Sequence, residues 1–327
     1  MTIGNVGGAA ELDLVSGLPP VEEAPEAAKV IQGRGPWRLA FERLRRDRAS
    51  VISAVVILLI IICAAAAPVF ATITGHGVNQ QFRLIGEQSN GFPTGPFGKF
   101  PLGADDQGRD VLVRLAYGAR VSLLVGVVTS ALTVAIGAVM GLMAGYLGRT
   151  VDSIIGRIID VTLSIPFLLF AVALASVEGG GSVTLVVIVL ALFGWSSVAR
   201  IVRGQVLSIK EREYIEAARS LGAGSWRIMF IDIFPNVIAQ VIVYASLLIP
   251  LSIVSEATLS YLGVGVQPPT ADWGAMISAA QQGGLYQVAW WYLVFPSLAL
   301  LITTLAFNIF GDGVRDAFDP RADRLFV

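Results

Sequence analysis

The sequence predicts an all-α integral membrane protein with six transmembrane helices. Hydrophobic residues make up 55% of its 327 residues and charged residues only 14%, whereas soluble domains carry roughly 25% charged residues. The charged residues are also clustered, so that long runs between them contain none. A transmembrane helix needs about 20 mostly apolar residues, because backbone groups cannot remain unpaired in hydrocarbon. Several of the uncharged runs reach that length.

These runs predict the individual crossings. The expected ranges are 51–70, 121–148, 153–177, 179–199, 233–255 and about 290–310. The uncharged run 273–311 is too long for one crossing, so residues 273–288 are expected to form an interfacial segment before the sixth helix. Arg157 and Asp160 lie three residues apart in the opening turns of the third span, and we expect them to form a local ion pair.

The positions of lysine and arginine predict the orientation. The tail before the first span and the loops 149–157, 200–232 and 312–327 hold 18 of the 23 basic residues, whereas the loops 178–182 and 265–290 hold none. Because basic loops stay on the cytoplasmic side, both termini are expected in the cytoplasm.

The chain is expected to have five parts. They are a disordered cytoplasmic N-terminal tail (1–36), an interfacial amphipathic helix (37–50), the first transmembrane helix with an extracytoplasmic loop (51–118), a core domain of five transmembrane helices (119–311) and a cytoplasmic C-terminal tail (312–327). In the second part, Trp37, Phe41 and Leu44 alternate with arginines at roughly helical spacing, which is typical of a helix lying in the interface. A plain positive anchor for the first span is the alternative.

The residues that would support catalysis are scarce. The chain has one cysteine, Cys63, and one histidine, His76, so no internal disulfide and no Cys/His metal site is predicted. None of the three lysines can complete the GxxxxGK[ST] motif of a phosphate-binding loop. ATP hydrolysis, if it drives this protein, must therefore come from another chain. The net charge of −1 gives no reason to expect a nucleic-acid partner.

The longest cytoplasmic loop between spans is the most informative stretch. Residues 214–221 are expected to form two turns of helix, and Gly222 suits its C-terminal cap because glycine adopts the left-handed conformation at low cost. A second helical stretch is expected from Ser225, and Pro235 lies where the fifth span begins. A short rigid helix outside the bilayer can serve as a knob that a partner protein grips. The alternative is a solvated connector.

This loop resembles the EAA loop of ABC-importer permeases. Glu216-Ala217-Ala218, Gly222 and Pro235 have the spacing of that family, with departures at Asp232 and Phe234, where the general pattern has isoleucine and leucine. The resemblance implies that the helix docks into a groove on a cytoplasmic ATPase and transmits its closure to the spans. The ATPase-coupling residues that it implies are Tyr214, Ile215, Glu216, Ala217, Ala218, Arg219 and Gly222.

The resemblance extends to the C-type permease subunit of dipeptide/oligopeptide importers over residues 37–321. The similar segments are 101–110, 117–123, 256–269, 273–276 and 311–321. This implies the type I ABC importer permease fold, a short peptide as substrate and a location in the inner (plasma) membrane of a prokaryote. Nickel and other small solutes are the alternative substrates.

The same resemblance implies a set of partners. They are a B-type permease that completes a heterodimer, one or two cytoplasmic ATPase subunits that hold ATP and Mg, and an extracytoplasmic solute-binding protein. No cofactor is expected in this chain itself. A self-sufficient secondary transporter would favour inverted repeats and a charge pair at mid-membrane, and the sequence has neither.

Four residues in or beside the spans are gating or structural candidates: Pro166, Pro235, Pro250 and Glu256. Pro166 and Pro250 fall inside the third and fifth spans, where a proline removes a helical hydrogen bond and kinks the helix. Such kinks can be hinges or static bends. Glu256 is interpreted either as an acid lining the pathway or as an acid at the outer interface, hydrogen-bonded to a neighbouring serine or threonine (Ser255, Thr258 or Ser260).

The outer loop 71–114 carries a further candidate site. Asp105, Asp106, Arg109 and Asp110 either form a docking surface for the binding protein or only brace the entry to the second span. The sequence leaves both interpretations open.

Overall fold

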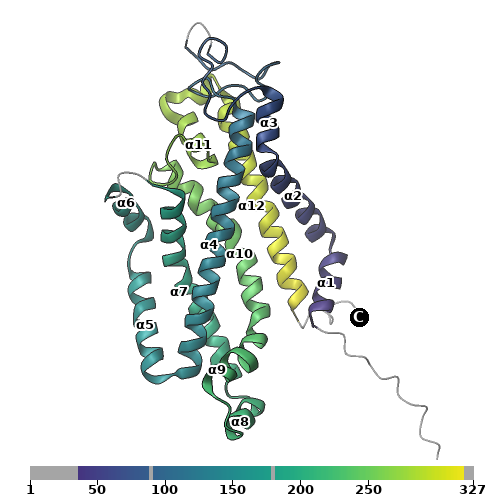
Figure 1. Ribbon diagram of the computed structural model, residues 1–327, viewed down its shortest axis with the longest axis vertical. Helices are drawn as coiled ribbons and strands as arrows, with labels where there is room; N and C mark the ends of the chain where they lie inside the picture. Colours follow the sequence, from purple (N-terminus) through teal and green to yellow (C-terminus); the bar gives the residue numbers. More distant parts are fainter. Residues whose placement is uncertain (1–35, 88–90, 178–180, 320–327) are drawn as a thin grey trace, which may run out of the picture. The chain divides into compact units, whose positions relative to one another are not determined.

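The computed structural model describes residues 36–87, 91–177 and 181–319. Within these ranges the regular structure is helical, with isolated β-bridges but no strand, which confirms the predicted fold class (Figure 1). The elements are α1 (Pro36–Arg46), α2 (Arg48–Ala65), α3 (Ala67–Thr74), α4 (Val111–Leu147), α5 (Arg149–Ser164), α6 (Phe167–Val177), α7 (Val183–Ile209), α8 (Glu213–Ser220), α9 (Ser225–Arg227), the π-helix η1 (Ile228–Ile233), α10 (Phe234–Tyr261), α11 (Trp273–Gln281), the 3-10 helix η2 (Gln282–Gln287) and α12 (Trp290–Phe318).

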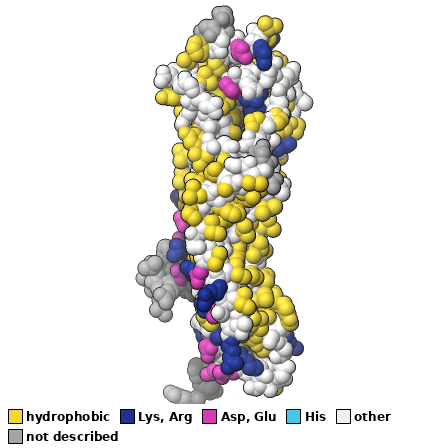
Figure 2. Space-filling model, turned by 90° about the vertical axis from the view of Figure 1, so that its left-hand side faces the viewer, with side chains coloured by type: hydrophobic (Ala, Val, Ile, Leu, Met, Phe, Trp, Pro, Cys, Tyr) yellow, Lys and Arg dark blue, Asp and Glu magenta, His cyan; other side chains and the backbone are white. Residues whose placement is uncertain are grey.

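Five stretches of helix are long and apolar enough to cross a membrane: α2, α4, α7, the continuous run α9–η1–α10, and α12. α5 and α6 together are also long and apolar enough to make a sixth span, but they are bent by 80° where they meet. Pro166 lies at this break, where its ring and missing N–H prevent the helix from continuing. Figure 2 shows hydrophobic side chains covering the middle of one face, with charged side chains gathered mainly toward its lower end.

Several helices run beyond the ranges predicted from charge. α4 begins at Val111 instead of residue 121, because Arg114 and Arg120 are compensated within the protein. Arg114 is buried, and Arg120 donates from Nη2 to the carbonyl oxygen of Ala65 at 2.7 Å. α12 likewise continues past residue 311 to Phe318, into the predicted tail. A charged residue marks the end of the apolar run, but the helix itself can continue beyond it outside the hydrocarbon.

The predicted amphipathic helix 37–50 is divided in two. α1 ends at Arg46, and Asp47 caps the start of α2 by accepting a hydrogen bond from the backbone N–H of Ser50 at 2.9 Å. Hydrogen bonds from Ser50 lower the pKa of Asp47. α1 also contacts the end of α12, where Arg43 donates to the carbonyl oxygen of Asp319 at 3.0 Å. Residues 1–35 and 320–327 of the predicted tails lie outside the described residues.

The ion pairs of α5 differ from the prediction. Asp160 pairs with Arg200 of α7, with 3.3 Å between Oδ1 and Nη2, so the expected Arg157–Asp160 pair is wrong. Nearer the start of α5 and the end of α7, Arg203 donates from Nη2 to Oδ2 of Asp152 at 2.7 Å. Both pairs join α5 to α7, a connection between helices that spacing along one helix cannot reveal.

The two remaining prolines lie within a continuous helix. Pro235 is the second residue of α10 and directly follows the π-helix η1, so it lies within the continuous run α9–η1–α10. α10 then continues without interruption through the buried Pro250 to Tyr261. The sharp break among these helices is therefore at Pro166.

The most closely packed helix contact is between α4 and α7. Gly137, Gly141 and Gly145 recur every four residues on α4 and face Val198, Ala199, Val202 and Val206 of α7. A Cβ atom at Gly141 would lie only 2.5 Å from the carbonyl oxygen of Ala199. Small residues at this spacing let two transmembrane helices approach closely, because lipid supplies no hydrophobic force to press them together. The α4–α7 pair is thus the most closely packed pair of helices among the described residues.

We expect Gly141→Ala to lower the melting temperature of the purified protein, because the new methyl group meets the rigid backbone of α7. Overpacking of this kind typically costs about 1–3 kcal/mol. Gly156→Ala is the matched control, since a Cβ atom there meets nothing within 4 Å and alanine favours a helix over glycine. Equal melting temperatures for the two variants would show that α4 and α7 are not tightly packed.

Candidate coupling site

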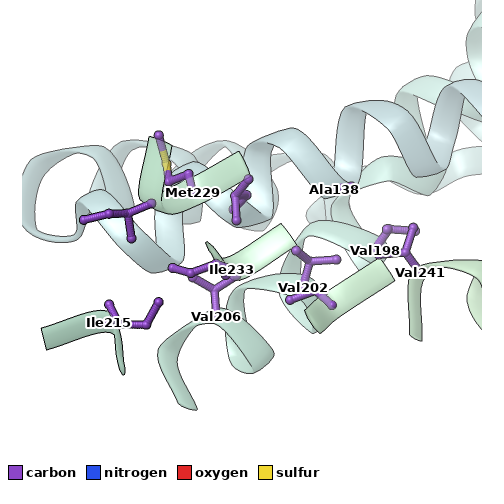
Figure 3. Close-up of a cluster of buried hydrophobic side chains, with 11 residues drawn as sticks. Ala138, Val198, Val202, Val206, Ile215, Met229, Ile233 and Val241 are labelled. Carbon is purple, nitrogen blue, oxygen red and sulfur yellow. The ribbon is translucent and has the colours of Figure 1, made fainter. Parts of the chain in front are cut away.

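The helix α8 lies outside the predicted spans, between α7 and α10, and is anchored by one side chain. Ile215 is fully buried in a cluster that includes Val206 of α7 and Met229 and Ile233 of η1 (Figure 3). Ala218 is partly buried against the same cluster. Apolar packing therefore holds α8 against α7 and η1.

The end of α8 has the predicted cap. Gly222 has φ +82°, the left-handed conformation, and the N–H of Ala223 donates to the carbonyl oxygen of Ala218 at 3.0 Å. This turn reverses the chain and leads into α9, which starts at Ser225 as expected. The cap therefore fixes the length of α8 and the angle at which the next helix leaves it.

The outer face of α8 is available for contact. Glu216, Ala217 and Arg219 are exposed, and nearly half of Tyr214 is exposed as well. The guanidinium group of Arg219 also lies over the ring of Tyr146 on α4, 5.9 Å from its centroid. The exposed face thus combines a carboxylate, a small alanine and an aromatic edge, while the opposite face packs against the rest of the protein.

An exposed aromatic pair next to α8 was not predicted from the sequence. Trp226 of α9 and Phe230 of η1 stack in parallel, with ring centroids 5.4 Å apart, and Trp226 is 66% exposed. Their spacing of four residues is the signal that could have revealed the pair, since such residues are neighbours on a helix surface. Both α8 and α9 lie at the lower end of the ribbon in Figure 1.

The candidate docking residues of the outer loop are mostly buried. Asp105 is fully buried and accepts a hydrogen bond from Nε of Arg109 at 2.6 Å. Burial raises the pKa of Asp105, although the positive charge of Arg109 acts to lower it. Asp110 caps α4 by accepting from the N–H of Leu112 at 2.8 Å and contacts His76 Nδ1 at 2.7 Å. These three acidic and basic residues therefore brace the entry to α4, and Asp106 alone remains partly exposed.

Glu256 lies inside the protein, not at an exposed interface. Its carboxyl group is fully buried and accepts hydrogen bonds from Ser122 of α4 and Ser260 of α10, each at 3.0 Å. Ser260 was one of its expected partners, whereas Thr258 donates to the carbonyl oxygen of Val254. The contact with Ser122 was not predicted, because the two residues are far apart in the sequence. Glu256 thus joins α4 to α10.

A second buried acid lies next to Glu256. Asp272 is fully buried and caps α11 by accepting from the N–H of Ala275 at 2.9 Å. Burial raises the pKa of Asp272 to about 6, with a contribution of the opposite sign from Arg114. The structure thereby gathers two carboxyl groups from α10 and the start of α11 at the outer end of α4.

The raised pKa of Asp272 predicts a pH dependence of stability. Because the folded state binds this proton more tightly than the unfolded state does, stability should increase as the pH falls from about 7 toward 4. Asp272→Asn keeps an oxygen that can cap α11, so the variant should lose most of this increase in melting temperature between pH 7 and pH 5. An unchanged pH profile would contradict the assignment to Asp272.

Comparison with known proteins gives two family matches. Residues 137–324 match the family described as binding-protein-dependent transport system inner membrane component. Residues 35–85 match the N-terminal transmembrane domain of oligopeptide transport permease C.

Relatives align along two thirds of the chain or more. The glutathione transport system permease protein GsiD of Pectobacterium atrosepticum is 38% identical over 288 residues, which cover 88% of this chain and 92% of that protein. The oligopeptide transport system permease protein OppC of Haemophilus influenzae is 38% identical, with 89% and 90% covered. The dipeptide transport system permease protein DppC of Bacillus subtilis is 43% identical, with 68% and 69% covered. The chain therefore belongs to the family of binding-protein-dependent transport system inner membrane components, as a C-type, multi-pass permease subunit of the ABC importers.

Proposed function

We propose that this chain forms half of the pathway by which an ATP-driven importer carries di- and oligopeptides across the membrane. The support for a peptide substrate is that the related permeases are named for oligopeptide, dipeptide and glutathione transport. The chain supplies the spans, and the energy comes from ATP bound with Mg to partner ATPase subunits. The same lysine positions that exclude a phosphate-binding loop support this division of labour.

The observation that carries the proposal is the two-sided construction of α8. Its inner face is fixed by the buried Ile215, while Glu216 and Ala217 are exposed on its outer face. A solvated connector has no need of a fully buried anchor. Docking into an ATPase groove uses both faces, because one must be gripped and the other must transmit the movement to α7 and α10.

The assembly that we propose contains three kinds of partner. A B-type permease completes the heterodimeric pathway, one or two cytoplasmic ATPase subunits bind α8, and an extracytoplasmic solute-binding protein delivers the peptide. The complex would lie in the inner (plasma) membrane of a prokaryote, with both termini of this chain in the cytoplasm. The concentration of basic residues in the predicted inner loops supports this orientation.

Transport by reconstituted vesicles tests the proposal. The chain is reconstituted with the proposed partner permease, ATPase and binding protein, and labelled dipeptide or Ni²⁺ is offered in parallel. We expect ATP-dependent uptake of the dipeptide and none when the ATPase is omitted. Uptake by this chain alone would contradict the dependence on partners, and uptake of Ni²⁺ without dipeptide would contradict the substrate class.

A further inference from the structure

A cavity of about 280 Å³ opens at the outer end of the protein, opposite α8. One wall carries Asp106, Arg109 and Arg114, together with Tyr292 from the start of α12. The other wall is built from the end of α10, the turn that follows it, and α11. This volume is close to the lower end of the range of about 300–1,000 Å³ that is typical of small-molecule sites.

The two arginines of this wall carry more donors than the protein satisfies. Arg109 and Arg114 are 7% and 4% exposed, and both contact the single carboxylate of Asp105. Each guanidinium group has five N–H donors. Nε of Arg114 is buried beside Asp105, 3.4 Å from its Oδ2, and Nη1 donates to Asn79 and the carbonyl oxygen of Val78, whereas Nη2 makes no hydrogen bond with a described residue. A carboxylate is the group that satisfies spare guanidinium donors best.

The same wall offers an acceptor for a positive group. Asp106 accepts from the hydroxyl of Tyr292 at 3.2 Å and lies 3.5 Å from Arg109, both through Oδ1. Its Oδ2 has no hydrogen-bond partner among the described residues, and the side chain is 35% exposed. An ammonium group that enters the cavity can therefore pair with this oxygen.

The charge balance selects the kind of ligand. Asp105 and Asp106 already offset the two arginines, and Glu256 and Asp272 are two further carboxyl groups buried nearby. A simple anion would add negative charge to this region, and a simple cation would leave the arginine donors unbonded. A molecule with one carboxylate and one ammonium group satisfies both sites and keeps the balance.

We propose that this cavity binds a short zwitterionic peptide of two or three residues by its two termini, with the carboxylate at Arg114 and the ammonium group at Asp106. The peptide class rests on the proposed function. The remainder of the cavity mixes apolar side chains, such as those of Val266 and Met276, with polar ones, such as those of Gln267 and Ser278, and accepts peptide side chains with little discrimination. The site holds the substrate at the outer mouth of this subunit, between its delivery and its passage.

Binding of labelled dialanine to the complete transporter in nanodiscs, without the binding protein, tests this site. Dialanine should bind. N-acetyl-dialanine and dialanine amide should each bind at least about tenfold more weakly, because each lacks one charge. Asp106→Asn should weaken dialanine binding while affecting N-acetyl-dialanine little. Glu87→Gln is the matched control, as it removes an outer-loop carboxylate that does not line the cavity.

The outcomes separate this inference from the proposed function. Equal binding of free and capped dialanine, or no binding by a transporter that imports dialanine normally, would overturn the site but leave the function intact. Loss of affinity for the binding protein in Asp106→Asn, with dialanine binding unchanged, would also overturn it and would assign the cavity to protein contact. Absence of ATP-driven dialanine uptake would instead reject the proposed function.

Discussion

Glu216→Lys is expected to abolish ATP-driven peptide uptake while the protein remains folded in the membrane. Glu216 is exposed on the outer face of α8 and makes no ion pair with another described residue, so its replacement should cost little stability. A lysine there reverses the charge that α8 presents to the ATPase, and like charges placed opposite each other at an interface cost several kcal/mol. Uptake is measured in reconstituted vesicles, and assembly is measured by co-purification of the ATPase.

The control for this variant is Glu211→Lys. Glu211 is also exposed and lies at the same end of the protein, but it precedes α8. It should therefore retain uptake and ATPase binding. If Glu216→Lys transports as well as Glu211→Lys does, α8 is not the contact through which the motor acts.

Asp105→Ala is expected to prevent stable folding or to lower the melting temperature more than any other change in the outer loop. Asp105 is fully buried, pairs with both Arg109 and Arg114, and accepts the N–H groups of Gln107 and Arg109. Removing one partner of a buried ion pair leaves uncompensated charge and typically costs about 3–5 kcal/mol. Thermal unfolding of the purified complex measures the effect.

Asp106→Asn provides the comparison at the neighbouring position. Its side chain is partly exposed and its contact with Arg109 spans 3.5 Å, so the loss should be about 1 kcal/mol or less. Similar melting temperatures for Asp105→Ala and Asp106→Asn would show that Asp105 does not hold the outer loop to α4.

The helices were largely predictable, whereas their ends were not. Uncharged runs identify the crossings, because hydrocarbon accepts only helices whose backbone is fully paired. The start of α4 at Val111 could not be predicted, since Arg114 is made tolerable by Asp105 and Asn79, which only the folding of the preceding loop brings to it. The division of the third span at Pro166 was anticipated as a kink, but the sequence alone does not give its angle of 80°.

The candidate sites divide in the same way. The limits and cap of α8 follow from local chemistry, so Gly222 could be identified from the sequence. That Ile215 faces inward depends on Val206 and Met229, which only the folded chain brings to it. The Asp160–Arg200 pair and the contact of Ser122 with Glu256 likewise join separate helices, and no local pattern encodes them. The outer cavity draws on residues from Asp106 to Tyr292 and was not predicted at all.

Crosslinking from Ala217 tests the central claim most directly. In a chain whose exposed Cys63 is replaced by alanine, Ala217→Cys is treated with a short bifunctional reagent in intact membranes, and Gly156→Cys on α5 serves as the control. The account predicts an adduct between the Ala217→Cys chain and an ATP-hydrolysing polypeptide, whose yield changes when nucleotide is added. The account would be contradicted if, in membranes that still transport peptide, Ala217→Cys formed no adduct with such a polypeptide or formed no more than Gly156→Cys does.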